Sequence, residues 1–165
     1  MTLSTWLAND ELFLRELREG HAWQMLPATF FTLAGLRVEV PALRERERQS
    51  QARQWSDTTD IVLNGWPIEV KSRREAFTSN IDYPYKTAFV DTVSGFEAKT
   101  TKPLAYVLVS RPTGAMLCLS VAKTRAVWKV VEKRDRVRDI DERFYVVGSR
   151  HLQPVGVLVD ALKAT

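Results

Sequence analysis

Apolar residues recur at helical spacing in the first part of the chain. Residues 4–18 carry leucines on one stripe with charged residues between them, and this pattern predicts a helix. Gly20 is expected to break or cap that helix. Residues 21–33 predict a second helix, in which Pro27 is expected to cause a kink or a restart. Gly35 follows as the expected end of the helical region.

The pattern becomes strand-like at residues 36–40 and again at residues 60–71, which read D-I-V-L-N-G-W-P-I-E-V-K. Asn64-Gly65 is the strongest short signal for a β-hairpin, because a type I′ turn needs φ > 0 at both central residues. With these two residues as the turn, three pairs lie directly opposite each other: Leu63 and Trp66, Ile61 and Ile68, and Asp60 and Glu69. One face of the hairpin then supplies apolar residues to a core, namely Ile61, Leu63, Trp66, Ile68 and Val70.

The other elements are expected to alternate between helices and strands, while the charged residues 41–56 predict a loop or a solvated extension of the first strand. We expect a helix at 87–98 capped by Thr87, strands at 104–109 and 115–119 around a turn at 111–114, a basic amphipathic helix at 121–138, a strand at 143–147 and a final helix after Pro154. This order predicts an α/β fold with a mixed central β-sheet flanked by helices, in a single domain of residues 1–165. A solvated surface explains the basic residues of 121–138 as well as contact with DNA does.

Composition narrows the classes of function without choosing one. The chain has 165 residues, a net charge of +4 and a pI of about 9.4, which is compatible with a polyanionic partner. A single cysteine, Cys118, excludes a disulfide framework and fits a reducing cytoplasm. The two histidines have no metal-ligand spacing, so a zinc site is not expected. No apolar run approaches membrane-spanning length, and neither a P-loop nor a G-x-S-x-G motif is present.

The polar face of the 60–71 hairpin carries the candidate chemistry. Asp60 and Glu69 are opposed, and Lys71 points the same way as Glu69 because it lies two residues further along the strand. Two carboxylates so close repel each other, and a hard divalent cation such as Mg²⁺ removes the repulsion. The lysine can then orient a water or stabilise charge that develops on a phosphate. The alternative is a surface hairpin with a Lys–Glu pair and an incidental aspartate.

Asp60, followed by Glu69-Val70-Lys71 at the end of the next strand, resembles the motif of the PD-(D/E)XK nuclease superfamily, with Thr59 in place of the proline. The pattern is most similar to that of Holliday-junction-resolvase-like and phage nucleases. The resemblance implies a restriction-endonuclease-like core and hydrolysis of phosphodiester bonds in DNA with Mg²⁺, for which Mn²⁺ can substitute. It also implies that Asp60, Glu69 and the Val70 carbonyl bind the metal while Lys71 orients the attacking water.

The first helix and the segment after the catalytic strand complete the candidate site. Residues 20–24, G-H-A-W-Q, resemble the resolvase-type helix that adds an acidic or amide side chain, which assigns this role to Gln24, with Glu19 and Glu16 as alternatives. The candidates for nucleic-acid contact are Arg73, Arg74, Tyr85 and Lys86. The expected enzyme is structure- or end-directed, and a homodimer would supply two cuts. The rival interpretation is a nuclease fold that binds nucleic acid or protein without cleaving it.

Overall fold

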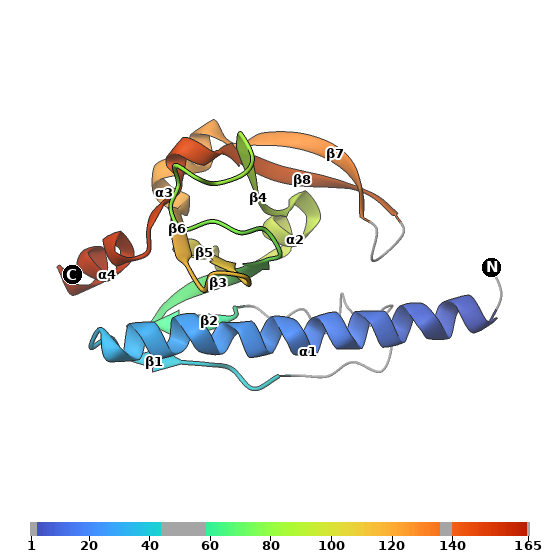
Figure 1. Ribbon diagram of the computed structural model, residues 1–165, viewed down its shortest axis with the longest axis horizontal. Helices are drawn as coiled ribbons and strands as arrows, with labels where there is room; N and C mark the ends of the chain where they lie inside the picture. The colour runs from blue at the N-terminus through green and yellow to red at the C-terminus, as the bar shows by residue number, and fades with distance from the viewer. Residues whose placement is uncertain (1–2, 44–58, 136–139, 165) are drawn as a thin grey trace.

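The computed structural model describes residues 3–43, 59–135 and 140–164, which form two β-sheets and their flanking helices (Figure 1). The larger sheet has the order β1-β2-β3-β5-β6-β9, and the smaller has the order β4-β8-β7. The strands of the larger sheet are β1 (Val38–Glu39), β2 (Ile61–Leu63), β3 (Trp66–Arg73), β5 (Ala105–Ser110), β6 (Met116–Ser120) and β9 (Gln153–Pro154). Those of the smaller sheet are β4 (Thr87–Thr92), β7 (Lys129–Asp135) and β8 (Ile140–Gly148). The helices are α1 (Leu3–Leu33), α2 (Val93–Ala98), α3 (Val121–Thr124) and α4 (Gly156–Lys163), with 3₁₀ turns at Arg125–Val127 and Ser149–His151.

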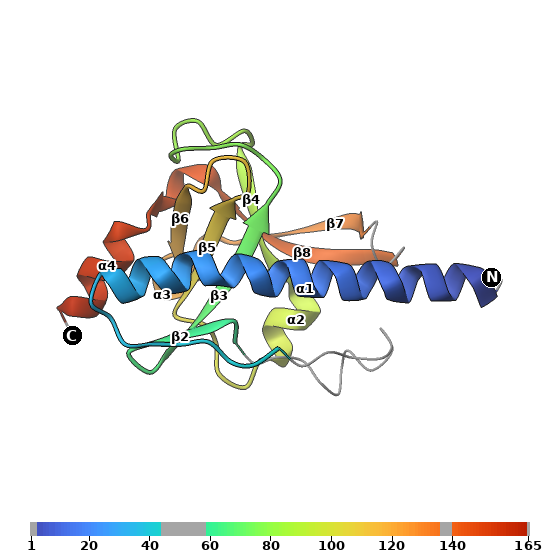
Figure 2. The same ribbon diagram turned by 60° about the horizontal axis from the view of Figure 1, so that its bottom comes forward.

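The larger sheet is mixed, because β3 and β5 pair in parallel while its other described pairs are antiparallel. Helices lie on it as the sequence predicts, so the α/β class with a mixed central sheet flanked by helices is confirmed (Figure 2). The charged segment expected to be a loop lies largely outside the described residues, from position 44 to position 58. None of the described helices is both long enough and apolar enough to span a membrane.

Helix α1 is continuous, so the interruptions expected at Gly20 and Pro27 are wrong. Inside a helix a glycine costs up to about 1 kcal/mol relative to alanine, and a proline removes a backbone hydrogen bond. Ala28 and Phe31 nevertheless bury their side chains in the core beneath the larger sheet. Most helical stability in proteins comes from packing of this kind, and here it outweighs the two local costs.

The end of α1 follows the sequence prediction at Gly35, which has φ +83°. The Leu36 N–H donates to the Phe31 carbonyl at 3.1 Å, and the Gly35 N–H donates to the Thr32 carbonyl at 2.9 Å. This pair of bonds is the Schellman pattern, in which a left-handed residue closes the last turn. The chain is thereby turned back toward β1.

The β2–β3 hairpin forms in the predicted register. Asn64 and Gly65 have φ values of 50° and 89°, as a type I′ turn requires. Leu63 pairs with Trp66 and Ile61 pairs with Ile68. Four of the five apolar residues expected in the core are buried, namely Ile61, Leu63, Ile68 and Val70. Trp66 is the exception at 50% exposed, because it follows the turn directly at the end of the strand.

Alternate residues of β3 face two different cores. Ile68 and Val70 join the core that α1 and α4 cover on one face of the larger sheet. On its other face, Tyr106 of β5 joins a second core with residues of α2, α3 and the smaller sheet. Since side chains alternate along a strand, Glu69 and Lys71 lie on this second face, between the two sheets.

Two predicted helices are wrong in whole or in part. Residues 87–92 form strand β4 and only 93–98 are helical, with Thr92 instead of Thr87 as the N-cap that accepts a hydrogen bond from the Gly95 N–H. The predicted helix at 121–138 ends after one turn and a 3₁₀ segment, and β7 follows. Its valines are β-branched and pack well on a pleated surface, and pairing with β8 determines the conformation.

Candidate functional site

Asp60 is fixed at the open end of the β2–β3 hairpin, immediately before β2. Its Oδ2 accepts a hydrogen bond of 2.7 Å from the Val70 N–H, and its Oδ1 accepts one of 2.8 Å from Gln24 Nε2 on α1. Within the described part of the chain, no lysine or arginine nitrogen lies within ion-pair distance of this carboxylate. Asp60 therefore lies beside Glu69 with hydrogen bonds but without a paired cation.

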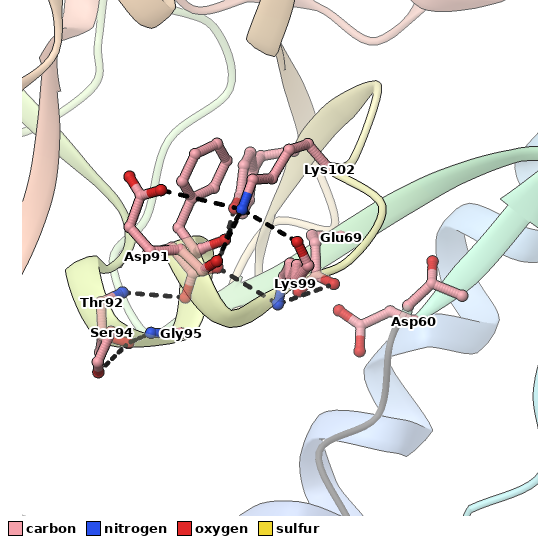
Figure 3. Close-up of polar contacts among 12 residues, drawn as sticks. Asp60, Glu69, Asp91, Thr92, Ser94, Gly95, Lys99 and Lys102 are labelled. Atoms are coloured by element: carbon pink, nitrogen blue, oxygen red, sulfur yellow. Dashed lines mark hydrogen bonds and ion pairs between the residues drawn. The ribbon is translucent and has the colours of Figure 1, made fainter. Parts of the chain in front are cut away.

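Glu69 belongs to a closed ring of alternating charges. Its two carboxylate oxygens lie 3.3 Å from Lys71 Nζ and 3.4 Å from Lys99 Nζ. The carboxylate of Asp91 lies 3.7 Å from Lys71 Nζ and 3.6 Å from Lys99 Nζ. Figure 3 shows Lys99 between Glu69 and Asp91, with Asp60 apart from them on the other side of Glu69. Glu69 and Asp91 both contact the Lys71 ammonium. The two lysines of the ring balance these two carboxylates, and Asp60 is a further carboxylate outside the ring.

Asp91, Lys99 and Tyr106 are members of the site that sequence analysis missed. Tyr106 lies beside Glu69 in the parallel pairing of β3 with β5, and its hydroxyl donates to Asp91 Oδ2 at 2.8 Å. A polar tip in the apolar strand L-A-Y-V-L-V is a sequence signal for this tyrosine. The predicted helix at 87–98 included Asp91, although Thr92 has the residue type of an N-cap and is therefore a signal that the helix begins after Asp91.

The charges of the site shift its pKa values in different directions. Burial raises the pKa of Asp60 from 3.8 to about 7, and repulsion from Glu69 adds to the rise against the attraction of Lys71. Burial also opposes ionisation of Asp91, but Lys71 and Lys99 outweigh it and lower the pKa of this carboxyl. For Lys71, burial disfavours the ammonium, yet Glu69, Asp91 and Asp60 together raise its pKa above the ordinary value. Lys71 is therefore a permanent cation at neutral pH.

The structure distinguishes the three candidate side chains of α1. Gln24 reaches Asp60 through its amide nitrogen, while its Oε1 lies 3.1 Å from His21 Nδ1. Glu19 instead pairs with Arg111 at 2.8 Å, and Glu16 pairs with Arg74 at 2.6 Å. Only Gln24 among the three contacts the carboxylates of the candidate site. Its nitrogen faces Asp60, so the amide would have to turn over before its oxygen could approach a metal there.

The oxygen atoms around Asp60 are of the types that coordinate hard cations. Carboxylates of Asp60 and Glu69 with the Val70 carbonyl match the ligand types of Mg²⁺, which often uses one or two carboxylates together with waters. Burial, and then repulsion from Glu69, raise the pKa of Asp60, and a cation bound there would favour its ionised form. Among residues 3–43, 59–135 and 140–164, no three histidine, cysteine, aspartate or glutamate side chains are grouped so that they alone could hold a metal. A metal would therefore depend on two carboxylates, a carbonyl and water.

A hollow of about 310 Å³ adjoins this group of residues. It lies between α1 and β3, and its lining includes Gln24, Asp60, Val70, Lys71 and Arg73. A phosphate group entering it would meet Lys71 and Asp60 together. This hollow gives Gln24, Asp60 and Lys71 access to a ligand, whereas Glu69 is buried and does not line it.

The four predicted nucleic-acid contacts do not lie together. Arg73 and Tyr85 line hollows that adjoin Lys71 or follow on from it. Arg74 instead turns to Glu16 on α1. Lys86 lines a further hollow near Trp128, which shares Thr87 and Val146 with the hollow of Tyr85 but does not adjoin Lys71. A nucleic-acid path through the site is therefore more consistent with Arg73 and Tyr85 than with the other two residues.

Comparison with known proteins identifies no family. No protein-family model matches the chain, and no curated protein matches it. Among solved structures, D212, a nuclease from a fusselovirus, aligns with a TM-score of 0.45 and 13% sequence identity, over 88% of this chain and 91% of that chain. The function is accordingly argued from the site itself.

Proposed function

We propose that this protein is a metal-dependent nuclease of the PD-(D/E)XK type that hydrolyses phosphodiester bonds in DNA. The observation that carries the proposal is the meeting of Asp60 and Lys71 in one hollow, with Glu69 3.3 Å from the Lys71 ammonium. The motif D-x₈-E-x-K supports the proposal, because the hairpin that carries it pairs Ile61 with Ile68, the residues next to Asp60 and Glu69.

Each residue has a role that its environment supports. Lys71 stays protonated, so it donates hydrogen bonds to a phosphate oxygen or to the attacking water and does not act as a base. Asp91 is a positioning residue, because its carboxylate lies 3.7 Å from the Lys71 ammonium, which Glu69 also contacts. Gln24 holds the Asp60 carboxylate in place. Asp60, Glu69 and the Val70 carbonyl would hold Mg²⁺, or Mn²⁺ in its place. When bound, such an ion polarises the phosphate and lowers the pKa of its water.

The substrate is proposed to be branched or to have a free end, as for resolvase-like and phage nucleases. A homodimer would place two such sites on one branched substrate and allow paired cuts. Lys71 lies at the junction of two hollows, which provides access for a strand from more than one side.

A second candidate function is binding without cleavage. Lys71 and Lys99 occupy both carboxylate oxygens of Glu69, and a metal would have to displace one of them. Gln24, where the related helix often carries an acid, reduces the negative charge further. If the ammonium groups of Lys71 and Lys99 already neutralise the Glu69 carboxylate, no metal binds there. The protein would then bind nucleic acid without cleaving it.

A cleavage panel distinguishes the two functions. Single-stranded, blunt duplex, flap and four-way DNA are incubated with the protein in Mg²⁺, in Mn²⁺ and in EDTA. The nuclease cuts at least one substrate with either metal and none in EDTA. Binding to these DNAs without cleavage in either metal would favour the second function and contradict the first.

A further inference from the structure

Two hollows on the smaller sheet adjoin the hollow at the candidate site. The first has a volume of about 390 Å³ and shares Lys71 and Arg73 with the hollow beside α1. The second has a volume of about 370 Å³ and shares Arg73, Phe89 and Lys133 with the first. We call this pair the aromatic groove and define it by six lining residues: Arg73, Tyr83, Tyr85, Phe89, Lys133 and Phe144. It leads away from Lys71 over strands β4, β7 and β8.

The rings of the groove are fixed in place and partly open to solvent. Phe89 and Phe144 meet edge to face with ring centres 5.4 Å apart. Tyr83 lies 5.3 Å from the buried ring of Phe77 and 6.3 Å from the ring of Tyr85, which is 54% exposed. Tyr85 therefore offers a ring surface to a ligand, and its neighbour anchors it to the core.

The loop that carries the two tyrosines is held by its own hydrogen bonds. The carboxylate of Asp82 accepts from the N–H groups of Thr78 and Ser79 and from both of their hydroxyls. These bonds favour the ionised form and lower the pKa of Asp82 to about 2. A ring presented on an ordered loop loses little conformational entropy when a ligand stacks on it.

Arg73 lies where all three hollows meet. Its Nη2 donates to the Phe89 carbonyl, while its Nε is buried and has no hydrogen-bond acceptor in the described part of the chain. Buried donors are nearly always paired in proteins, so this guanidinium has spare hydrogen-bonding capacity. Of its bonds to described residues, the guanidinium would give up the one to the Phe89 carbonyl to turn toward a phosphate, with which arginine pairs well.

Charge alone does not account for a ligand in the groove. Lys133 lies over the Phe89 ring at 4.9 Å and supplies a cation beside Arg73. Glu75 and Glu132 line the same groove and offset this charge. A duplex presents mainly phosphates and hides its base faces, so such a groove attracts it weakly. An unpaired strand also offers base faces, which stack favourably on aromatic side chains in single-strand binding.

We propose that the aromatic groove binds an unpaired DNA strand that runs from the site at Lys71, with a base stacked on Tyr85 and a phosphate at Arg73. The identification of the ligand as DNA rests on the proposed function. The inference specifies that function further: the substrate has a single-stranded portion, as in a flap, a frayed end or a junction arm.

The test measures binding in EDTA, where metal-dependent cleavage does not occur. Fluorescence anisotropy follows a labelled oligothymidylate and a blunt duplex of the same length. The wild type is expected to bind the single strand more tightly than the duplex. Tyr85→Ala should weaken single-strand binding by at least about fivefold, the effect of losing one stacked base. Tyr85→Phe retains the ring and should stay within about twofold of the wild type.

A pair of charge variants completes the design. Lys133→Gln, in the groove, should reduce the salt dependence of single-strand binding by about one unit of slope. Lys163→Gln changes an exposed residue of α4, a helix that packs on the other face of the larger sheet, and should leave the salt dependence unchanged. Equal binding by Tyr85→Ala and the wild type, or tighter binding of the duplex, would overturn the groove assignment even in a protein that cleaves DNA. The expected losses in a protein that cleaves no DNA would support the groove and overturn only the proposed chemistry.

Discussion

Lys99 bridges Glu69 and Asp91 through one ammonium group, 3.4 Å and 3.6 Å from their oxygens. The side chains of Lys99, Glu69 and Asp91 are 13%, 6% and 10% exposed, so water screens these charges little. Removing one member of such a cluster leaves the others charged and only partly solvated. The ring of charges is therefore a condition for holding Lys71 where the proposed chemistry needs it.

Lys99→Met should lower the free energy of unfolding by about 3 kcal/mol, the usual cost of breaking a buried ion pair from one side. Arg37→Met is the control, because its ion pair with Glu39 is 71% and 62% exposed and should cost less than about 1 kcal/mol. Urea denaturation measures both variants. Equal losses in the two would show that the ring of charges does not stabilise the fold.

Asp60 gives the protein a predicted pH dependence. Its pKa is about 7 in the folded protein and 3.8 ordinarily, so the folded state keeps a proton that the unfolded chain loses between these values. This contribution to stability is complete below about pH 4 and is lost as the pH rises through about 7. The free energy of unfolding of the wild type should fall between about pH 5 and about pH 8, by about 2 kcal/mol more than that of Asp60→Asn. Parallel profiles from urea denaturation would contradict the assigned environment of Asp60.

At the scale of the elements, α1 determines which side chain joins the site. The sequence left Gln24, Glu19 and Glu16 as alternatives, because a helix pattern interrupted by Gly20 and Pro27 did not fix their directions. The continuous helix brings Gln24 to Asp60 and turns Glu19 to Arg111. The resemblance to the resolvase-type helix also favours Gln24, and its role in cleavage stays a prediction.

Gln24→Ala should slow cleavage by about tenfold or more, because Asp60 loses the amide that orients it. Glu19→Ala should leave the rate within about twofold, since its partner Arg111 also bonds to Ser72 and keeps its place. Single-turnover cleavage of a flap substrate measures the chemical step in both variants. The opposite ranking would transfer the auxiliary role to Glu19.

The hairpin and the residues around it show what local sequence can predict. The turn type of Asn64-Gly65 fixes the register, and the register places Glu69 and Lys71 on one face. The conformation of residues 129–135 could not be assigned in this way, because their valines fit both a helix and a strand. Only pairing with β8 makes this segment a strand. Asp91 approaches Lys71 only through packing of the smaller sheet on the larger, and no local pattern contains that information.

At the scale of the whole molecule, the site forms where the two sheets meet. Glu69 comes from β3, Asp91 from β4 and Tyr106 from β5, and Asp60 lies at the open end of the β2–β3 hairpin. The order of elements predicted the α/β class, since that depends on element types alone. The enclosure of the site depends on long-range packing between the sheets.

Metal binding should stabilise the whole fold. If Asp60 and Glu69 hold the cation only when β2 and β3 are paired, the folded state binds it more tightly than the unfolded chain. Mn²⁺ at a hundredfold excess over Kd should then add roughly 3 kcal/mol to the free energy of unfolding and raise Tm. Asp60→Asn should lose most of this gain, as thermal melts with Mn²⁺ and with EDTA will show. An equal rise of Tm in both proteins would place the cation elsewhere.

Single-turnover plasmid nicking in Mg²⁺ measures the proposed cleavage of DNA by Lys71 and its carboxylate neighbours. Lys71→Ala should lower the rate by at least about a hundredfold, the usual effect of removing one group that stabilises the transition state. Lys123→Ala removes an exposed lysine of α3 and should nick at the rate of the wild type. Circular dichroism confirms that each variant is folded. Nicking by folded Lys71→Ala at the rate of Lys123→Ala would contradict the account.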